Sequence, residues 1–201
     1  MIPTPVRIAC VGASITFGLG LPNRREECYP AVVGRLLGGS YAVRNFGYSG
    51  AAAGRSTNEP YWETPSLLAA ERFRPDLVVL MLGTNDAQHA NRSSLATFAD
   101  DYAALIDLFR GWAGSPVVGV ILPPPVFEPM AEIDIRALDT RVRPAVENIA
   151  RRARLPVIDG YEPLRKRGDL FPDNLHPDAE GARLLANDVA AVIDRLNLDV
   201  N

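Results

Sequence analysis

The chain has 201 residues, of which 47% are hydrophobic and 22% are charged, and its formal net charge is −3 at pH 7. These values indicate one globular domain over residues 1–201 and exclude a disordered chain or a membrane span. The slightly acidic balance offers no basic surface, so we expect no nucleic acid as a partner.

The first residues, MIPTPVRIACVG, enter a strand without the charged and apolar segments of a secretory signal. We therefore expect a cytoplasmic protein, unless a leader has been removed from the sequence. The two cysteines, Cys10 and Cys28, form no CxxC motif and no cluster with histidine. Neither a disulfide framework nor a metal site is expected, and the prediction includes no cofactor.

Short apolar runs alternate with helical patterns along the whole chain. The expected strands lie at 6–11, 41–46, 76–82, 117–122 and 156–160, and the expected helices at 26–38, 65–73, 94–113, 132–154 and 177–196. The strands are continuously apolar, as strands buried on both faces are. This alternation predicts an α/β fold, in which a parallel sheet with right-handed crossovers has helices on both faces.

Four loops, at 47–65, 83–94, 122–132 and 168–177, come after predicted strands, the last of them after a short extension. Ser14, in CVGASITFG, begins the loop after the first strand. Ligands of open parallel sheets bind at the carboxyl ends of the strands. We therefore expect Ser14 and these loops to form one site.

A serine nucleophile needs a base, and the chain has only two histidines, His89 and His176. In PDNLHP, Asp173 precedes His176 by three residues, so its carboxylate can orient one ring nitrogen and leave the other facing Ser14. The alternative is that Asp173 and His176 cap the final helix, with Pro177 at its first position. His89 lies in a polar loop and contacts either solvent or the substrate.

Two residues are candidates to stabilise an oxyanion. Gly47, in NFGYSG, follows the second strand, where a backbone N–H can approach a ligand closely. Asn85, in LMLGTNDA, follows the third strand and offers an amide donor. Each residue is also a common turn former, which is the structural alternative.

The motifs GASIT, NFGYSG, GTND and DNLHP occur in this order and together resemble the SGNH hydrolases, the GDSL-like esterase and lipase family. The resemblance extends from residue 6 to about residue 196. It implies a three-layer α/β/α sandwich with a five-stranded parallel sheet of flavodoxin-like topology. It also implies a catalytic triad of Ser14, Asp173 and His176, and an oxyanion hole made by the N–H groups of Ser14 and Gly47 and the amide of Asn85.

One position departs from the family pattern. The family usually has an aspartate before the nucleophile, and this chain has Ala13. That carboxylate is not part of the triad, so we expect activity to be retained. The departure bears on the hydrogen bonds that hold the turn at Ser14 and on the pKa tuning that a nearby negative charge would supply.

The expected function is hydrolysis of short-chain carboxylic esters through an acyl-enzyme, with an acetylated carbohydrate as the favoured small-molecule substrate. Tyr61 and Trp62, in the loop after Gly47, either form a stacking face for a sugar or pack the loop against the domain. Together with His89 they are the candidate substrate-binding residues. Arylesterase, thioesterase and lysophospholipase activities are the alternatives within the family.

Two other classes of function are weighed against an esterase. SITFGLG offers hydroxyls and helix-entry amides to a phosphate, as in a flavodoxin-like cofactor-binding domain, but it lacks GxGxxG and a P-loop lysine. The second class is a catalytically silent relative that binds a carbohydrate or a protein. The cofactor-binding alternative gives Gly47, Asn85, Asp173 and His176 no shared purpose. Only Ala13 favours the silent relative, since suitable residues fill all five active-site positions.

Overall fold

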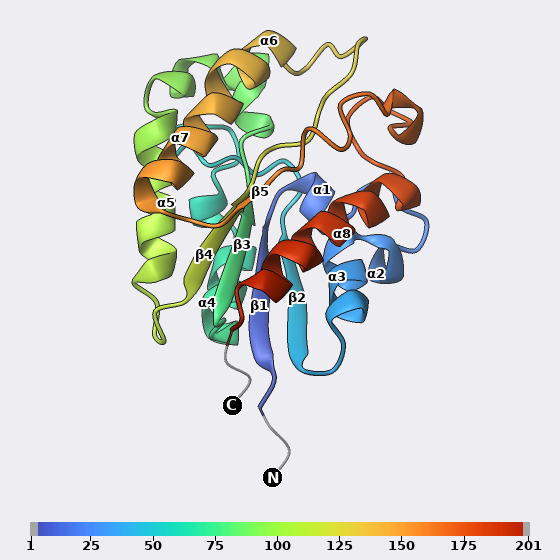
Figure 1. Cartoon of the computed structure of the whole chain (residues 1–201). Helices are drawn as coiled ribbons and strands as arrows, with labels where there is room; N and C mark the ends of the chain where they lie inside the picture. Colours follow the sequence, from blue (N-terminus) through green and yellow to red (C-terminus); the bar gives the residue numbers. More distant parts are fainter. Residues whose placement is uncertain (1–3, 199–201) are drawn as a thin grey trace.

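The computed structural model describes residues 4–198, which fold around a central parallel β-sheet (Figure 1). The strand order is β2-β1-β3-β4-β5. The strands are β1 Val6–Gly12, β2 Tyr41–Gly47, β3 Leu77–Met81, β4 Val117–Ile121 and β5 Val157–Ile158. This order is the flavodoxin-like one, so the predicted fold class is confirmed.

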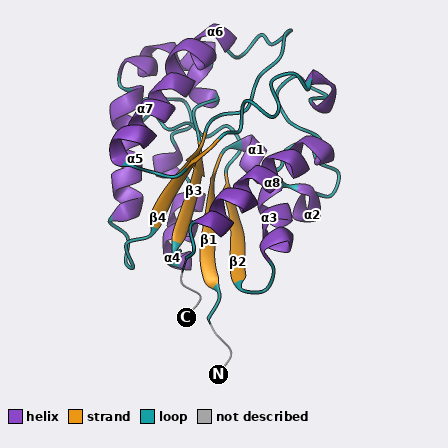
Figure 2. Ribbon diagram, in the orientation of Figure 1, coloured by secondary structure: helices purple, strands orange, loops and turns teal. Residues whose placement is uncertain are grey.

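Helices cover both faces of the sheet, which gives the domain three layers (Figure 2). One face packs against α3 Tyr29–Leu37 and α8 Ala179–Arg195, and the other against α4 Pro65–Phe73, α5 Phe98–Arg110 and α7 Arg143–Ala153. The shorter helices are α1 Ser14–Phe17, α2 Arg24–Glu27 and α6 Ile135–Ala137. Single 3₁₀ turns or segments occupy Tyr61–Glu63, Asn85–Ala87, His89–Ala96 and Gly168–Leu170, and Leu138–Val142 is π-helical.

β1, an interior strand of the sheet, shows why the strands are continuously apolar. Ile8 and Cys10 pack into the core beneath α3 and α8, whereas Ala9 and Val11 pack into the core beneath α4, α5 and α7. All four side chains are fully buried. Successive side chains of a strand point to opposite faces, so a strand covered on both sides needs apolar residues at every position.

The helix predicted at 26–38 is divided into α2 and α3 at Cys28, which has extended backbone angles. Pro30 explains the division, because proline has no N–H to donate to the carbonyl of Glu26. Arg35 Nη1 donates to that carbonyl instead, at 2.6 Å. The Arg35 side chain, from α3, thereby supplies the hydrogen bond that the backbone cannot make at Pro30.

Other predicted helix boundaries also shift. The helix predicted at 94–113 begins at Phe98, because the residues before it are 3₁₀-helical. The one predicted at 132–154 begins at Ile135 and contains a π-helical turn just before Pro144, which cannot donate a backbone hydrogen bond. The last helix begins at Ala179 rather than at 177.

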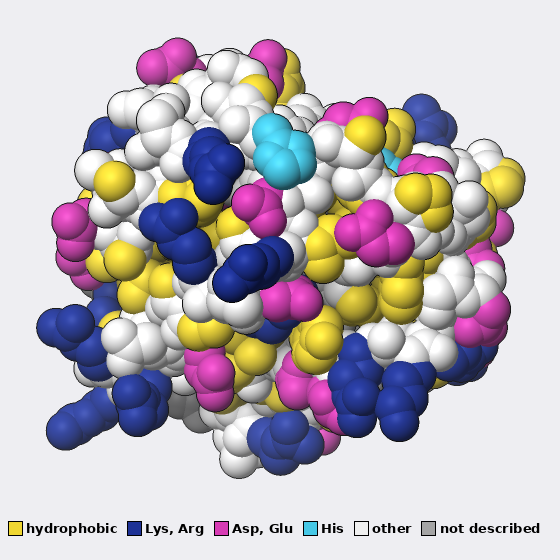
Figure 3. Space-filling view, turned by 90° about the horizontal axis from the view of Figure 1, so that it is seen from above, with side chains coloured by type: hydrophobic (Ala, Val, Ile, Leu, Met, Phe, Trp, Pro, Cys, Tyr) yellow, Lys and Arg dark blue, Asp and Glu magenta, His cyan; other side chains and the backbone are white. Residues whose placement is uncertain are grey.

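The carboxyl ends of the strands lie at the upper edge of the sheet in Figure 1, where α1 follows β1. Figure 3 views this edge from above and shows cationic, anionic and hydrophobic side chains interspersed across the face. None of the helices within residues 4–198 has the length and hydropathy needed to cross a membrane.

Candidate active site

Ser14 lies at the centre of the carboxyl edge of the sheet. β1 ends at Gly12, Ala13 follows, and Ser14 is the first residue of α1. In the register of the sheet, Gly12 pairs with Gly47 at the end of β2 and with Met81 at the end of β3. The loops that follow both neighbouring strands therefore start beside the serine.

The loop before α8 brings Asp173 and His176 to this serine. His176 Nε2 lies 2.8 Å from Ser14 Oγ, and His176 Nδ1 lies 2.6 Å from Asp173 Oδ2. A carboxylate accepts hydrogen bonds only, so Nδ1 is the protonated nitrogen and Nε2 is free to accept the serine proton. The three residues thus have the geometry of a nucleophile, a general base and the group that orients the base.

Asp173 is held in place by its own loop. Its Oδ1 accepts hydrogen bonds from the backbone N–H groups of His176 at 2.7 Å and Leu175 at 3.1 Å. Partial burial raises the pKa of Asp173, but the hydrogen bonds from His176 and Leu175 outweigh burial and hold the pKa below its ordinary value. The helix itself is capped by Asp178, which accepts from Gly181 N at 2.9 Å. The alternative that Asp173 and His176 cap the last helix is therefore wrong.

Gly47 is not available as an oxyanion donor, contrary to the sequence prediction. Its backbone N–H donates to Asn45 Oδ1 at 2.9 Å. A Cβ at this position would overlap the backbone of Phe17. The glycine is needed because β2 approaches α1 closely, which is a packing requirement that sequence reasoning did not separate from catalysis.

The side chain of Asn45 links β2 to the serine turn. Its Nδ2 donates to the carbonyl of Thr16 at 2.6 Å while its Oδ1 accepts from Gly47 N. Ala13, at the position before α1, makes no side-chain capping bond. The turn that lacks the family aspartate is thus held by a hydrogen bond from the neighbouring strand.

A second glycine in NFGYSG offers a free donor. Gly50 has a φ of +86°, a conformation that glycine adopts readily, and its N–H has no hydrogen-bond acceptor within residues 4–198. The next residue, Ala51, accepts a hydrogen bond from Asn85 Nδ2 at 2.9 Å, so this loop lies against Asn85. The NFGYSG motif contains both glycines. Asn45 distinguishes them, because its Oδ1 accepts the hydrogen bond of the Gly47 N–H and leaves the Gly50 N–H free.

Asn85 is buried, and three hydrogen bonds hold it, two at its carboxamide and one at its backbone carbonyl. Its Nδ2 donates to Ala51 O, its Oδ1 accepts from Gln88 Nε2 at 3.1 Å, and its backbone carbonyl accepts from Asn91 Nδ2 at 2.8 Å. An amide nitrogen has two N–H groups, so one remains for a ligand. Asn85 and Ser14 line the same pocket, as the sequence predicted for an oxyanion donor.

Asp86 is a buried carboxylate that the sequence analysis did not single out. It accepts hydrogen bonds from Ala53 N at 3.0 Å and Gly54 N at 2.7 Å. Burial raises the pKa of Asp86 to about 6, although these hydrogen bonds act in the opposite direction. The GTND motif thus provides a pocket residue, Asn85, and next to it an anchor for the loop after β2.

The three candidate substrate-binding residues do not line the pocket at Ser14. Tyr61 is fully buried and its hydroxyl donates to Phe46 O at 2.8 Å, so it cannot stack on a sugar. Trp62 donates to Ala53 O at 2.8 Å, and the Arg55 guanidinium lies 3.5 Å from the centre of its ring. His89 is exposed and its backbone N–H donates to Glu132 O. Of the two roles considered for Tyr61 and Trp62, packing of the loop is the one observed.

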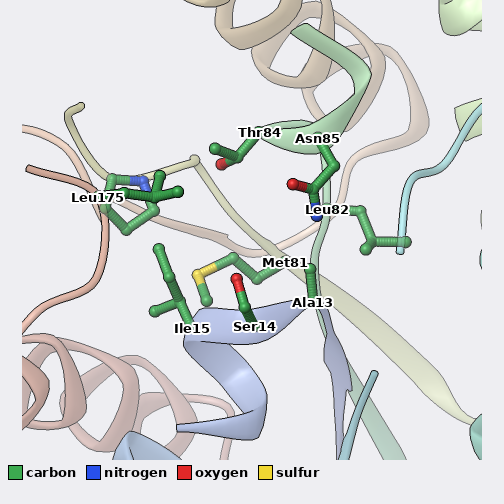
Figure 4. Close-up of a pocket in the computed structure, with 9 residues that line it drawn as sticks. Ala13, Ser14, Ile15, Met81, Leu82, Thr84, Asn85 and Leu175 are labelled. Carbon is green, nitrogen blue, oxygen red and sulfur yellow. The ribbon is translucent and has the colours of Figure 1, made fainter. Parts of the chain in front are cut away.

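The pocket beside Ser14 is small and largely aliphatic (Figure 4). Its volume is about 10 Å³. The lining residues are Ala13, Ser14, Ile15, Met81, Leu82, Thr84, Asn85, Pro124 and Leu175. Within the described part of the chain, no group of three or more histidine, cysteine, aspartate or glutamate side chains is placed to hold a metal ion.

Comparison with known proteins identifies the family of this chain. The model of the GDSL-like lipase/acylhydrolase family matches residues 10–184. An acetylxylan esterase from Xylanibacter ruminicola is 30% identical in an alignment 214 residues long, gaps included, and the match covers 96% of this chain and 45% of that protein. The chain thus spans about half the length of this relative.

Solved structures with the same fold include two esterases. Est24, a carbohydrate acetylesterase from Sinorhizobium meliloti, has a TM-score of 0.76 at 20% identity and covers 95% of this chain and 99% of its own. An aryl esterase from M. smegmatis has a TM-score of 0.72 at 20% identity, with coverage of 95% and 99%. The family model, the relative and the fold agree, and the chain belongs to the GDSL-like lipase/acylhydrolase family.

Proposed function

We propose that this chain is a serine esterase that hydrolyses acetyl esters of carbohydrates through an acyl-enzyme. The observation that favours this most directly is the hydrogen-bonded path from Asp173 through His176 to Ser14 Oγ, with distances of 2.6 and 2.8 Å. It ends at a pocket that also contains the free amide N–H of Asn85. The alternative of a flavodoxin-like cofactor-binding domain gives this path no role.

Acylation begins when His176 Nε2 takes the proton from Ser14 Oγ as the oxygen attacks the ester carbonyl carbon. The carbonyl oxygen becomes an anion, and Asn85 Nδ2 and the N–H groups of Ser14 and Gly50 are the donors available to it. Asp173 stabilises the imidazolium and keeps Nδ1 protonated. His176 then gives its proton to the alcohol oxygen, the ester C–O bond breaks, and the alcohol leaves.

Deacylation repeats these steps with water as the nucleophile. His176 Nε2 removes a proton from water, and the hydroxide oxygen attacks the carbonyl carbon of the acyl-serine. The second oxyanion is held by the same donors. Return of the proton from His176 to Ser14 Oγ releases the carboxylic acid and restores the free enzyme.

The acetyl group and the carbohydrate rest on two further observations. The pocket volume of about 10 Å³ is close to the least that holds one water molecule, so it suits an acetyl methyl better than a long acyl chain. The curated relative is an acetylxylan esterase, and one of the structures with the same fold is a carbohydrate acetylesterase. Acetyl esters of sugars are the substrates that agree with both the size of the pocket and the activities of these similar proteins.

Hydrolysis of p-nitrophenyl acetate tests the mechanism. Ser14→Ala is expected to lower kcat by about 10³-fold or more, because the remaining groups stabilise charge but cannot form the acyl-enzyme. Ser40→Ala is the matched control, since Ser40 is exposed before β2 at the opposite edge of the sheet. A Ser14→Ala variant with wild-type kcat and intact folding would disprove the proposed nucleophile.

The substrate is tested by measuring kcat/KM for acetylated xylo-oligosaccharides, phenyl acetate and an acetyl thioester. We expect the acetylated sugar to give the highest value. A clear preference for phenyl acetate or the thioester would retain the serine mechanism and replace the carbohydrate with the aryl or thiol leaving group.

A further inference from the structure

The pocket beside Ser14 combines reactive and inert surfaces. In Figure 4 the Ser14 hydroxyl and the Asn85 amide point into the same space from opposite sides. Apart from Thr84, the remaining wall consists of aliphatic or thioether side chains, namely Ala13, Ile15, Met81, Leu82, Pro124 and Leu175. Polar groups therefore contact one side of a bound acyl group and apolar groups contact the other.

The chemistry of the intermediate determines which part of the substrate meets the apolar wall. The tetrahedral carbon bonded to Ser14 Oγ has three other substituents. The oxyanion must face the donors at Asn85, and the leaving oxygen must reach His176 Nε2 to be protonated. The acyl chain is left with the remaining direction, and the aliphatic side chains are the surface that this pocket offers it.

We propose that this wall is an acyl subsite that accepts acetyl and excludes longer chains, and that Met81 sets the limit. The proposal rests on the serine esterase function proposed above. It adds the residue that determines acyl length, which neither the family assignment nor the triad specifies.

The size of the subsite gives the first argument. Its volume of about 10 Å³ leaves room for a group the size of a water molecule or a methyl. Met81 is 4% exposed and Leu82 2% exposed, so both belong to the close-packed core. The methylene group that propionyl adds to acetyl would have to displace a packed side chain, because protein interiors contain few voids.

The position of Met81 gives the second argument. It is the last residue of β3 and pairs with Gly12, two residues before the nucleophile. In Figure 4 its side chain extends along the pocket, and its sulfur end lies near Ser14 and Ile15. Its backbone is fixed in the sheet, whereas Leu175 is only partly buried in a loop and has room to move toward solvent. Met81 is thus a buried wall residue whose backbone is held by the sheet where a longer acyl chain meets it.

The chain-length profile of Met81→Ala tests the proposal. The measurement is kcat/KM for p-nitrophenyl acetate, propionate, butyrate and hexanoate. The thioether removed beyond Cβ is longer than the two carbons that distinguish butyryl from acetyl. We expect the butyrate-to-acetate ratio to rise by about 10- to 100-fold, which is the discrimination that one or two methylene groups provide in a fitted pocket. Wild-type protein should show strong preference for acetate.

Two further variants keep the test decisive. Met130→Ala makes the same chemical change at a partly buried methionine that packs against the α4–α5–α7 core and does not line the pocket, so its ratio should match wild type. Met81→Val removes less volume and suits a strand, so it remains informative if Met81→Ala does not fold. It should raise the propionate-to-acetate ratio.

The outcomes separate the two proposals. Ser14-dependent acetate hydrolysis with unchanged chain-length ratios in a folded Met81 variant would overturn Met81 as the limit. Absence of any Ser14-dependent acetate hydrolysis in wild-type protein would instead overturn the esterase function itself. Equal wild-type rates for acetate and hexanoate would also overturn the acyl subsite.

Discussion

Replacement of Asp86 by asparagine is expected to change how the stability of the domain depends on pH. Burial raises the pKa of Asp86 from its ordinary value of 3.8 to about 6, although Ala53 and Gly54 donate hydrogen bonds to it. The folded protein therefore binds a proton at Asp86 more tightly than the unfolded chain does. This contributes stability that is complete below the unfolded pKa and is lost as the pH rises through about 6.

A pKa difference of roughly two units corresponds to about 3 kcal/mol in the free energy of unfolding. The Asp86→Asn variant does not ionise at this position. The free energy of unfolding of wild-type protein minus that of the variant should therefore fall by about 3 kcal/mol between about pH 4 and pH 7. Titrating groups that are unchanged by the substitution, such as Asp173, cancel in this difference.

Urea unfolding followed by circular dichroism at several pH values measures this difference. Asp107→Asn, at an exposed position of α5, is the matched control, and its difference from wild type should stay within about 0.5 kcal/mol at every pH. A wild-type minus Asp86→Asn difference that is flat, or that rises with pH, would refute the argument that burial dominates the electrostatics of this carboxylate.

Three predictions concern hydrogen bonds around the site. Asn45→Ala frees the serine turn from β2, so kcat for p-nitrophenyl acetate should fall about 10²-fold, whereas Asn148→Ala, at an exposed position of α7, should leave kcat unchanged. Tyr61→Phe removes a buried hydrogen bond and should lower the free energy of unfolding by about 1–2 kcal/mol in urea titrations, with KM for an acetylated sugar unchanged. Asp173→Asn should reduce kcat by about 10²- to 10⁴-fold in steady-state assays with little change in KM, because the base loses its correct tautomer.

The hydrogen-bonded arrangement of the proposed triad could be predicted from the sequence, because each of its determinants is local or topological. The apolar runs predict a parallel sheet, and a parallel sheet brings its strand-end loops to one edge. The spacing of Asp173 and His176 then lets one side chain orient the other within a single turn. No long-range packing detail is needed to expect that His176 meets Ser14.

The aromatic residues of the loop after β2 show where this reasoning ends. Pro60 pairs with Ala52, and Tyr61 N donates to Ala52 O at 2.8 Å, so the loop folds back on itself. That fold turns Tyr61 into the core, where its hydroxyl reaches Phe46 O. A tyrosine has an apolar ring and a polar tip, so its sequence context alone does not distinguish a buried ring from a sugar platform.

The substitution at Ala13 becomes intelligible only when the neighbouring strand is considered. α1 is a single turn, and a side chain before it is one way to hold such a turn. Asn45, in β2, holds the other end of this turn, because its Nδ2 donates to Thr16 O. Its Oδ1 accepts from Gly47 N in the same strand. The Asn45 side chain whose Oδ1 occupies the Gly47 N–H therefore also holds the turn of the proposed nucleophile through its Nδ2, and Gly50 is left as the free donor in that loop. The side chain of Asn45 thus explains both how the turn is held without the family aspartate and why Gly47 is not a free donor.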